Sequence, residues 1–341
     1  MEKVILVTGG TGYLGSWVVQ KLLSKGYSVR VPVRNKQNKD KYSHLLELAK
    51  DYPDKLSLFE ADLLSSGSFD DAAEGAHAII HMASPFTLRF KDAEKDLILP
   101  AVNGTRNVLN AASKSSTVKK VVLTSSVAAV HGDNIDLKNL GVDEFTEEHF
   151  NFSSSAKHQP YSFSKVMAEK EAWTLHNQQK RWKMVVINPS LVMGPSISKQ
   201  SNSESLKIME DLIAGKFSFG APDLQFGFVD VRDVADAHIL ALENDNAEGR
   251  HILVSRVANF IELANTIEEN FPQKFKLPRK TSPKVLMYLV GWIFGLSPKF
   301  ISRNVGHSLK FNNAKSINNL GLKYTPLEAT IRDMVNQMVS S

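Results

Sequence analysis

The chain has 341 residues, of which 43% are hydrophobic, and a formal net charge of +5. A chain of this length and hydrophobic share can bury a large core, as one big α/β domain or two unequal ones, which excludes a disordered protein. The absence of cysteine excludes disulfides, thiolate zinc sites and cysteine nucleophiles, and lysines mixed with acids along the chain argue against a dedicated nucleic-acid surface.

Neither the N-terminus nor the longest apolar stretch predicts a membrane span. The start, MEKVILVTGG, has an apolar run of only four residues before a glycine turn, so we interpret it as a strand rather than a secretory signal and expect a cytoplasmic protein. The longest apolar stretch, residues 285–296, is interrupted by glycine and is shorter than the roughly 20 residues of a span. A packing helix is our first interpretation of this stretch, and a peripheral membrane contact is the alternative.

Short β-rich runs alternate with helical patterns over the first 195 residues. We predict strands at residues 4–10, 27–34, 55–62, 76–84, 119–126 and 183–190 and helices at residues 17–25, 44–50, 69–75 and 161–178. A long helical stretch that ends with residues 102–114 is also predicted. Strands and helices that alternate at this spacing indicate a parallel sheet covered on both faces. After about Pro195 the alternation loosens into loops, a short strand near residues 226–233, a helix at residues 233–244 and a C-terminal part with several prolines.

The segment TGGTGYLG, residues 8–15, places Gly9, Gly12 and Gly15 directly after the first predicted strand and at the start of the first predicted helix. Glycine lets the backbone turn tightly and lets a pyrophosphate approach the helix N-terminus, whose free N–H groups favour negative charge. A glycine triplet alone is weak evidence, but this position at the head of an alternating series predicts a dinucleotide site. The same loop contains Thr11, Tyr13 and Leu14.

The end of the second strand normally selects the cofactor. An acid there would hydrogen-bond the ribose 2′-hydroxyl of NAD and repel the 2′-phosphate of NADP. This chain instead has Arg34, followed by further lysines. Because a guanidinium suits a phosphate, we predict NADP(H), with Arg34 as the first contact and Lys41 as the second. Asp62, at the end of the third predicted strand, is placed to meet the adenine edge or to cap the next helix.

A series of motifs runs through nearly the whole chain in a fixed order: TGGTGYLG, VPVRNKQ, ADL, HMASPF, VNGTRNVL, TSS, YSFSK, NPSLVMGP, FVDVRDVADAH and EGRHI. In this series the chain resembles the extended short-chain dehydrogenases/reductases, and among them the dihydroflavonol reductase-like group with its cinnamoyl-CoA and yeast-type methylglyoxal and carbonyl reductases. The resemblance implies an α/β fold, a Rossmann-type doubly wound parallel sheet with a smaller C-terminal substrate-binding lobe. We predict an NADP-binding domain with the catalytic residues at 1–195 and a lobe at 196–341 whose segments cross back to it.

The motif YSFSK supplies Tyr161 and Lys165, whose separation by four residues puts both side chains on one face of a helix. A tyrosine is a poor acid near pH 7, and we expect the neighbouring ammonium to lower the pKa of Tyr161. The resemblance implies that Tyr161 gives a proton to the substrate oxygen while the nicotinamide gives hydride to the carbonyl carbon. It also implies that Lys165 holds the nicotinamide ribose and that Ser126 hydrogen-bonds the same oxygen.

The resemblance also implies further cofactor contacts at the ends of the strands. Ala83 and Ser84 would meet the phosphate and ribose, Thr124 and Ser125 would support Ser126, and Leu63 would lie beside Asp62. The nicotinamide end would be met by Asn188, Pro189, Ser190, Leu191 and Val192.

The predicted substrate residues are Phe86, Ser126, His131, Tyr161 and Met193, with Phe152 and Phe228 as further candidates. Most are apolar, which favours a hydrophobic ketone or aldehyde. His131 stands where the plant dihydroflavonol reductases carry asparagine, so it could be a pocket wall, a hydrogen-bond donor to substrate or a loop residue facing water. We expect no metal site, because His77 and His81 lie four apart on a strand, where this spacing makes no ligand pair.

The predicted function is therefore NADP-dependent carbonyl reduction by a monomer or homodimer that acts on a small molecule. A 3β-hydroxysteroid dehydrogenase or a sugar-nucleotide epimerase would share the same machinery, although Arg34 argues against an enzyme that retains NAD. An NADP-sensing binding protein of NmrA type is the alternative from another class, and it predicts a damaged catalytic set, whereas Ser126, Tyr161 and Lys165 are all present.

Overall fold

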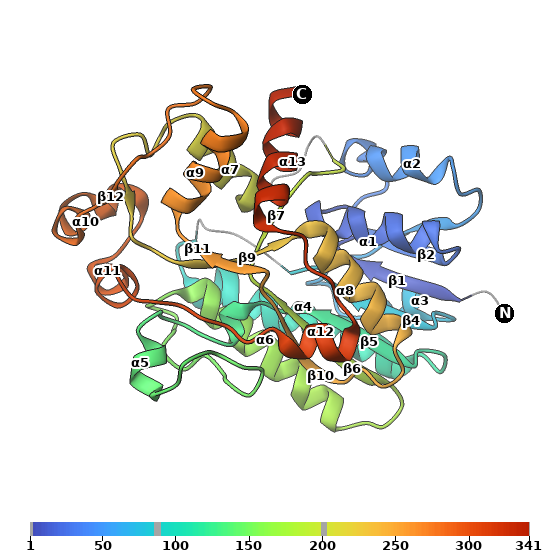
Figure 1. Cartoon of the computed structure of the whole chain (residues 1–341). Helices are drawn as coiled ribbons and strands as arrows, with labels where there is room; N and C mark the ends of the chain where they lie inside the picture. The colour runs from blue at the N-terminus through green and yellow to red at the C-terminus, as the bar shows by residue number, and fades with distance from the viewer. Residues whose placement is uncertain (1–2, 85–89, 199–202, 341) are drawn as a thin grey trace.

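The computed structural model describes residues 3–84, 90–198 and 203–340 and has a seven-stranded parallel sheet at its centre (Figure 1). The strand order is β10–β6–β5–β4–β1–β2–β3. The bounds of these strands are β1 Val4–Thr8, β2 Ser28–Val33, β3 Leu56–Glu60, β4 Ala78–His81, β5 Lys120–Thr124, β6 Lys183–Pro189 and β10 Gly249–Leu253. The order reverses at β1, as in a doubly wound fold, so the predicted fold class is confirmed.

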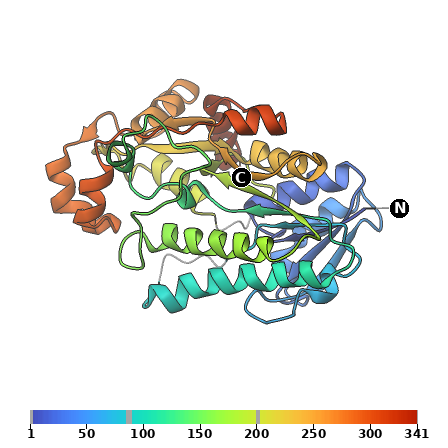
Figure 2. The ribbon, with the colours of Figure 1, turned by 90° about the horizontal axis from the view of Figure 1, so that it is seen from below.

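Helices cover both faces of this sheet. On one face pack α1 (Tyr13–Ser24), α2 (Ser43–Ala49), α8 (Val231–Glu243) and α12 (Ala314–Leu320). On the other pack α3 (Asp70–Ala73), α4 (Leu99–Lys114) and α6 (Pro160–Asn177). Figure 2 shows α4 and α6 side by side. Successive strand residues point to opposite faces, so Ile5 and Leu6 of β1 enter different cores, which explains the unbroken apolar runs of the strands.

The second half of the chain contributes to both parts of the molecule. Strand β10 and helices α8 and α12 belong to the layers of the large sheet, whereas the remaining elements form a smaller lobe. The lobe holds a β11–β9–β7 sheet and a β12–β8 pair. Its elements are β7 Leu191–Met193, α7 Glu204–Ile213, β8 Ala221–Pro222, β9 Phe226–Asp230, β11 Arg256–Ala258, α9 Phe260–Asn270, β12 Thr281–Ser282, α10 Lys284–Val290, η4 Gly291–Phe294, α11 Pro298–Asn304 and α13 Leu327–Ser340. A division at residue 195 stays a prediction.

Four short elements complete the fold: η1 Lys39–Lys41, the π-helical turn η2 Glu94–Ile98, η3 Val127–Ala129 and α5 Asp136–Leu140. None of the helices in the described ranges is long and apolar enough to cross a membrane. Within these same ranges, no group of three or more acidic or histidine side chains could hold a metal ion.

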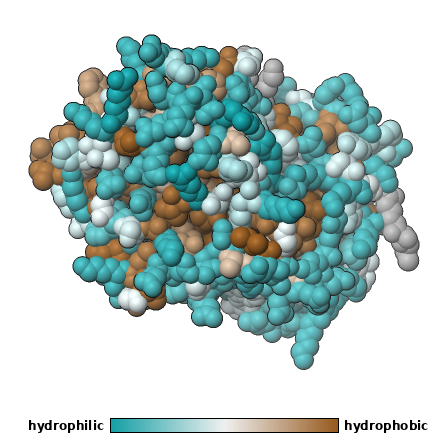
Figure 3. All heavy atoms as spheres, viewed as in Figure 1, coloured by the Kyte–Doolittle hydropathy of each residue, from teal (hydrophilic) through white to brown (hydrophobic). Residues whose placement is uncertain are grey.

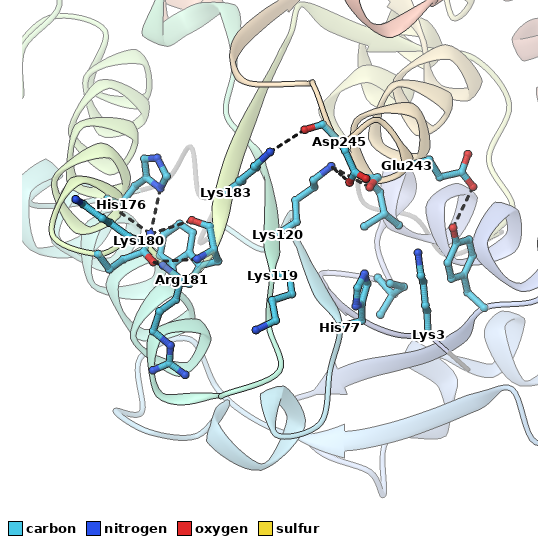
Figure 4. A pocket seen from close by; sticks show the side chains of 15 residues that line it. Lys3, His77, Lys119, Lys120, His176, Lys180, Arg181, Lys183, Glu243 and Asp245 are labelled. Carbon is cyan, nitrogen blue, oxygen red and sulfur yellow. Dashed lines mark hydrogen bonds and ion pairs between the residues drawn. The ribbon is translucent and has the colours of Figure 1, made fainter. Parts of the chain in front are cut away.

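A cavity of about 720 Å³ lies at the amino ends of the parallel strands (Figure 4). Two of its lysines serve the fold. Lys120 donates to the carbonyl oxygens of Ala241, Leu242 and Asn244 and so caps the C-terminus of α8, and Lys183 donates to the carbonyl oxygen of Asp245. Ligands of doubly wound sheets bind at the carboxyl ends of the strands, so the candidate site lies at the opposite edge.

Candidate active site

The glycine loop joins β1 to α1, and at Gly9 and Gly15 it has no space for a larger residue. Gly9 has a φ of +73°, and a Cβ added to Gly15 would lie 2.0 Å from the carbonyl oxygen of Gly9. Gly12 is the N-cap of α1, and the first turn of this helix has neither a capping side chain nor an acid. The resulting concave loop before free helical N–H groups fits a pyrophosphate. The side chains of Tyr13 and Leu14 turn away into the core, where the Tyr13 hydroxyl donates to the carbonyl oxygen of Gly194 at 2.6 Å.

Two of the predicted cofactor cations follow β2 at the surface. Arg34 and Lys41 are exposed, and within the described ranges neither side chain has an acidic partner. Such cations fit a phosphate, because no other ion pair has to break first. Asp62 follows β3, and its Oδ1 accepts a hydrogen bond from the backbone N–H of Leu64 at 2.8 Å, so it caps a turn; its contact with adenine stays a prediction. Leu63 packs partly buried beside α4.

Three hydroxyls end β5, and the fold gives each a different partner. Thr124 lies 2.6 Å from Nε2 of His238, whose Nδ1 lies 2.7 Å from the carbonyl oxygen of Val234. Burial lowers the pKa of His238 to about 4, so the ring is neutral, Nδ1 carries the proton and the Thr124 hydroxyl donates to Nε2. Ser125 donates to Glu169 at 2.5 Å. Thr124 and Ser125 therefore hold the strand end in place.

Ser126 differs from its two neighbours. Its Oγ accepts a hydrogen bond from the N–H of Ala128 at 3.1 Å at the start of η3, and its other contact, to the carbonyl oxygen of Pro189, is a long 3.5 Å. The N–H of Ala128 therefore orients the oxygen, while the hydroxyl proton can turn to a better acceptor. Helix α6 packs against η3, which brings Ser126 and the YSFSK motif to the same edge of the sheet.

Helix α6 presents Tyr161 and Lys165 on one face, with Nζ of Lys165 5.7 Å from the centre of the Tyr161 ring. Burial raises the pKa of Tyr161 to about 12. Burial also lowers the pKa of Lys165 to about 8, although the charge of Glu169 opposes this shift. The expectation that the ammonium lowers the pKa of Tyr161 is therefore wrong for this structure, because the cost of burying a phenolate exceeds the attraction of the neighbouring cation.

Glu169, one turn beyond Lys165, is a site residue that the sequence reasoning missed. Its buried carboxylate accepts hydrogen bonds from Ser125 at 2.5 Å and from Nδ2 of Asn188 at 2.9 Å, and it lies 2.6 Å from Nε of Arg250. The same amide of Asn188 also donates to the backbone oxygen of Ser126 at 3.1 Å. Glu169 thus joins α6 to β5, β6 and β10. The spacing of Tyr161, Lys165 and Glu169, four and eight residues along one helix, was its only sequence signal.

A second network, also missed, holds the start of α6. Gln159 adopts a left-handed conformation with φ 53°, and its amide donates to the carbonyl oxygen of Gly132 at 2.8 Å and to Asp133 at 2.7 Å. His158 lies 2.9 Å from both oxygens of the same buried carboxylate. From α11, Arg303 forms an ion pair with Asp133. The segment after Ser126, the start of α6 and the C-terminal lobe therefore meet at one carboxylate.

The predicted substrate residues have different surroundings. His131 stacks on Phe145 with ring centres 5.3 Å apart and meets Phe311 edge-on at 5.1 Å, and burial lowers its pKa to about 4. His131 is therefore a neutral, partly buried member of an aromatic cluster. Met193 and Phe228 are fully buried in the lobe core, and Phe152 is exposed. Phe86 lies outside the described residues, and substrate contact by any of these side chains stays a prediction.

The remaining predicted cofactor residues gather at the same edge. A small cavity there is lined by Ala83, Ser84, Thr124, Ser125 and Lys165, together with Glu169. Pro189 ends β6, Ser190 donates from its hydroxyl to the carbonyl oxygen of Leu253, and Leu191 and Val192 begin β7. Thr11 lies half-buried in the glycine loop.

A doubly wound sheet with this glycine loop at its first helix and a Ser–Tyr–Lys set at its carboxyl edge defines a protein of the short-chain dehydrogenase/reductase type. Residues 5–255 match the model of the NAD dependent epimerase/dehydratase family. The chain belongs to this family, as an extended short-chain dehydrogenase/reductase of the dihydroflavonol reductase-like group. The resemblance predicted from the motif series is thereby confirmed.

Several known proteins similar to this chain are reductases. A cinnamoyl-CoA reductase of Medicago truncatula is 40% identical over 99% of this chain and 96% of its own length. A dihydroflavonol 4-reductase of Gerbera hybrida is 35% identical over 81% of this chain and 74% of its own length. Among solved structures, Gre2 of Candida albicans in complex with NADPH has a TM-score of 0.81 and 32% identity over 99% of each chain.

Proposed function

We propose that this protein is an NADPH-dependent reductase that converts a hydrophobic ketone or aldehyde to the alcohol. The observation that carries this proposal is the position of Ser126, Tyr161 and Lys165 at one edge of the sheet, beside the glycine loop. The reductase names of the relatives support the same class of reaction. The apolar and aromatic side chains around His131 favour a hydrophobic substrate.

NADP(H) is the cofactor that the residues fit. The glycine loop would hold its pyrophosphate and Arg34 its 2′-phosphate, in keeping with the NADPH that is bound in Gre2 of Candida albicans. When bound, NADPH supplies the hydride for the carbonyl carbon. Lys165 would hold the nicotinamide ribose through its Nζ.

The chain's own residues then handle the proton. A pKa of about 12 keeps Tyr161 protonated at neutral pH, so its Oη holds the proton that the substrate oxygen needs. Proton transfer leaves a phenolate, which the ammonium of Lys165 stabilises, and Glu169 favours the charged form of that lysine. The hydroxyl of Ser126 donates to the same substrate oxygen and orients the carbonyl group.

The test is a screen of NADPH consumption over aromatic aldehydes, α-dicarbonyls, β-keto esters, dihydroflavonols and cinnamoyl-CoA. Turnover of at least one carbonyl is expected. Tyr161→Phe removes only the phenolic hydroxyl, and it should lower kcat for that substrate roughly a hundredfold to ten-thousandfold with NADPH affinity near normal. Tyr288→Phe, the same change at an exposed tyrosine, is the control.

Two results would contradict the proposal. If the Tyr161→Phe variant reduced the substrate at the wild-type rate, Tyr161 would not be the proton donor. If the wild-type protein consumed no NADPH with any of the carbonyl compounds but bound NADP tightly, a redox-sensing binding protein would be favoured instead.

A further inference from the structure

The charges of this chain are distributed unevenly. Residues 270–327 contain ten of the 41 lysines and arginines and none of the 36 acidic residues. This segment therefore has a formal charge of +10, of which Arg303 and Lys310 are paired with acids outside the segment, while the rest of the chain carries a net negative charge. The positive net charge of the protein thus resides in one segment of the C-terminal lobe, which includes α10, η4 and α11.

The helical hairpin within this segment exposes large apolar side chains. Val285, Leu289 and Trp292 are 74%, 68% and 75% exposed, and their spacing of four and three residues puts them on one side of α10 and η4. Leu286 and Tyr288 are also exposed. We call these five residues the α10 face. Figure 3 shows hydrophobic side chains at the left edge of the molecule, where Figure 1 places α10.

The α10 face is not needed to hold the hairpin together. The opposite side of α10 carries Met287, which is buried against Ile301 and Val305 of the α11 region. Lys284 donates to the carbonyl oxygens of Ser302 and Val305 and fastens the two helices to each other. The inner side therefore has its partners, whereas the α10 face meets solvent with enough apolar surface for an interaction site.

Exposed cations flank the α10 face in the chain. Arg279 and Lys280 precede β12 and α10, and Lys299 lies on α11, which packs against α10. Within the described ranges these three side chains have no acidic partner. Tryptophan and leucine on one side with lysine and arginine around them is the composition of helices that lie in the interface of anionic membranes.

We propose that the α10 face binds the surface of membranes that contain anionic lipids, with Val285, Leu289 and Trp292 entering the boundary between headgroups and acyl chains. A second copy of the chain suits the face less well, because a symmetric contact would bring two acid-free segments together and their like charges would repel. The alternative that the apolar stretch 285–296 left open is thus favoured for its outer side, while its inner side packs against α11.

The test is sedimentation of the full-length protein with vesicles of phosphatidylcholine alone or mixed with phosphatidylserine. The protein should sediment with the anionic vesicles, and added salt should weaken this binding. The double substitution Leu289→Ser with Trp292→Ser should weaken it at least tenfold while NADPH affinity stays unchanged. Leu64→Ser, which changes a leucine 60% exposed on the large domain, is the matched control.

Charge and insertion can be tested separately. Arg279→Gln with Lys280→Gln should lower sedimentation with anionic vesicles and leave sedimentation with vesicles of phosphatidylcholine alone unchanged. Wild-type tryptophan emission should shift to the blue on anionic vesicles, and Trp292→Phe should lose most of this shift.

Three outcomes would overturn the proposal. In the first, the wild-type protein stays in solution with anionic vesicles. In the second, the Leu289→Ser, Trp292→Ser variant binds them as strongly as the wild type does. In the third, the wild type is a dimer and the double substitution makes it a monomer without changing vesicle binding. The last result would make the α10 face a contact between subunits.

Discussion

Burial governs the ionisation of the two central side chains of the site. It raises the pKa of Tyr161 and lowers that of Lys165, so in the protein alone it opposes the ion pair that a phenolate and an ammonium would form. A phenol that stays protonated is suited to give a proton, which is what carbonyl reduction requires. The neighbouring lysine is then the group whose titration falls within the working range of pH.

The pH dependence of NADPH use should report Lys165. Its pKa of about 8 means that the ammonium is complete below pH 7 and is lost as the pH rises through 8. With a saturating carbonyl substrate, kcat/KM for NADPH should therefore fall about tenfold per pH unit above that value, because this ratio reports the free enzyme. Steady-state rates across this range measure the effect. If kcat/KM for NADPH stayed constant up to pH 10, the ionisation of Lys165 would not control the use of NADPH.

The choice of cofactor should depend on one exposed guanidinium. Arg34→Glu replaces a cation that suits the 2′-phosphate with an acid that repels it, so the ratio of kcat/KM for NADPH to that for NADH should fall by at least tenfold. Measuring both constants tests this expectation. Lys138→Glu makes a similar charge change on α5 and should leave the ratio unaltered; an unchanged ratio in Arg34→Glu would exclude this side chain from the phosphate site.

At the scale of elements, the start of α6 is held from outside the helix. Gln159 occupies a left-handed conformation that glycine would adopt more easily, and contacts with Gly132 and Asp133 retain it there. Tyr161 follows two residues later, so the direction of its side chain depends on this turn. Asp133 is in turn bound by Arg303 and Asn304 of α11, which makes the start of α6 sensitive to the C-terminal lobe.

Asp133→Asn should therefore reduce both stability and catalysis. Burial alone would raise the pKa of Asp133, but hydrogen bonds from Arg303, Asn304 and His158 lower it below its usual value, so the residue is a buried anion. The substitution removes the negative charge that pairs with Arg303, and it should reduce the free energy of unfolding by about 3 kcal/mol. A displaced Tyr161 should lower kcat by roughly tenfold to a hundredfold.

Urea unfolding and kcat measure the two effects, and Asp143→Asn, at an exposed aspartate, is the control. A variant with reduced stability but an unchanged kcat would limit Asp133 to a structural role.

Local sequence patterns predicted the glycine loop and the helix of Tyr161 well, because the residues that form each of them lie close together in the chain. The glycine loop and the Tyr161–Lys165 pair depend on one turn and one helix, and both are found where they were expected. The predicted helix at 69–75 shrinks to α3, four residues long, and η3, α5 and β7 had no clear signal. These short elements exist because distant segments pack against them. The contacts of Glu169 span up to 81 positions to Arg250, so no local pattern could indicate them.

At the scale of the whole molecule, buried histidines should make the fold sensitive to acid. Burial lowers the pKa of His81 to about 3 and those of His131, His238 and His251 to about 4. In the unfolded chain the same groups titrate near 6.5, so below that pH the unfolded state binds protons that the folded state cannot. The free energy of unfolding should therefore fall as the pH drops from about 6.5 to 4, by up to about 1.4 kcal/mol per pH unit for each histidine.

Urea unfolding at several pH values between 6.5 and 5 measures this slope. His238→Gln should reduce this slope by the contribution of about one bound proton, since glutamine does not titrate. A wild-type free energy of unfolding that stays constant over this range would contradict the prediction.

The amino-acid sequence by itself determined the family, the doubly wound sheet, the glycine loop, the charge at the cofactor-selecting position and the Ser126, Tyr161 and Lys165 set. The sheet, the glycine loop and the charge follow from short-range periodicity or from residue types at a fixed spacing, whereas the family and the Ser126, Tyr161 and Lys165 set follow from the resemblance that the ordered motifs carry. Only the tertiary structure decided that β10 joins the large sheet, that Glu169 and Asp133 hold α6 in place, and that the pKa of Tyr161 rises rather than falls. Burial and long-range contacts produce these features, and both exist only once distant segments have packed together.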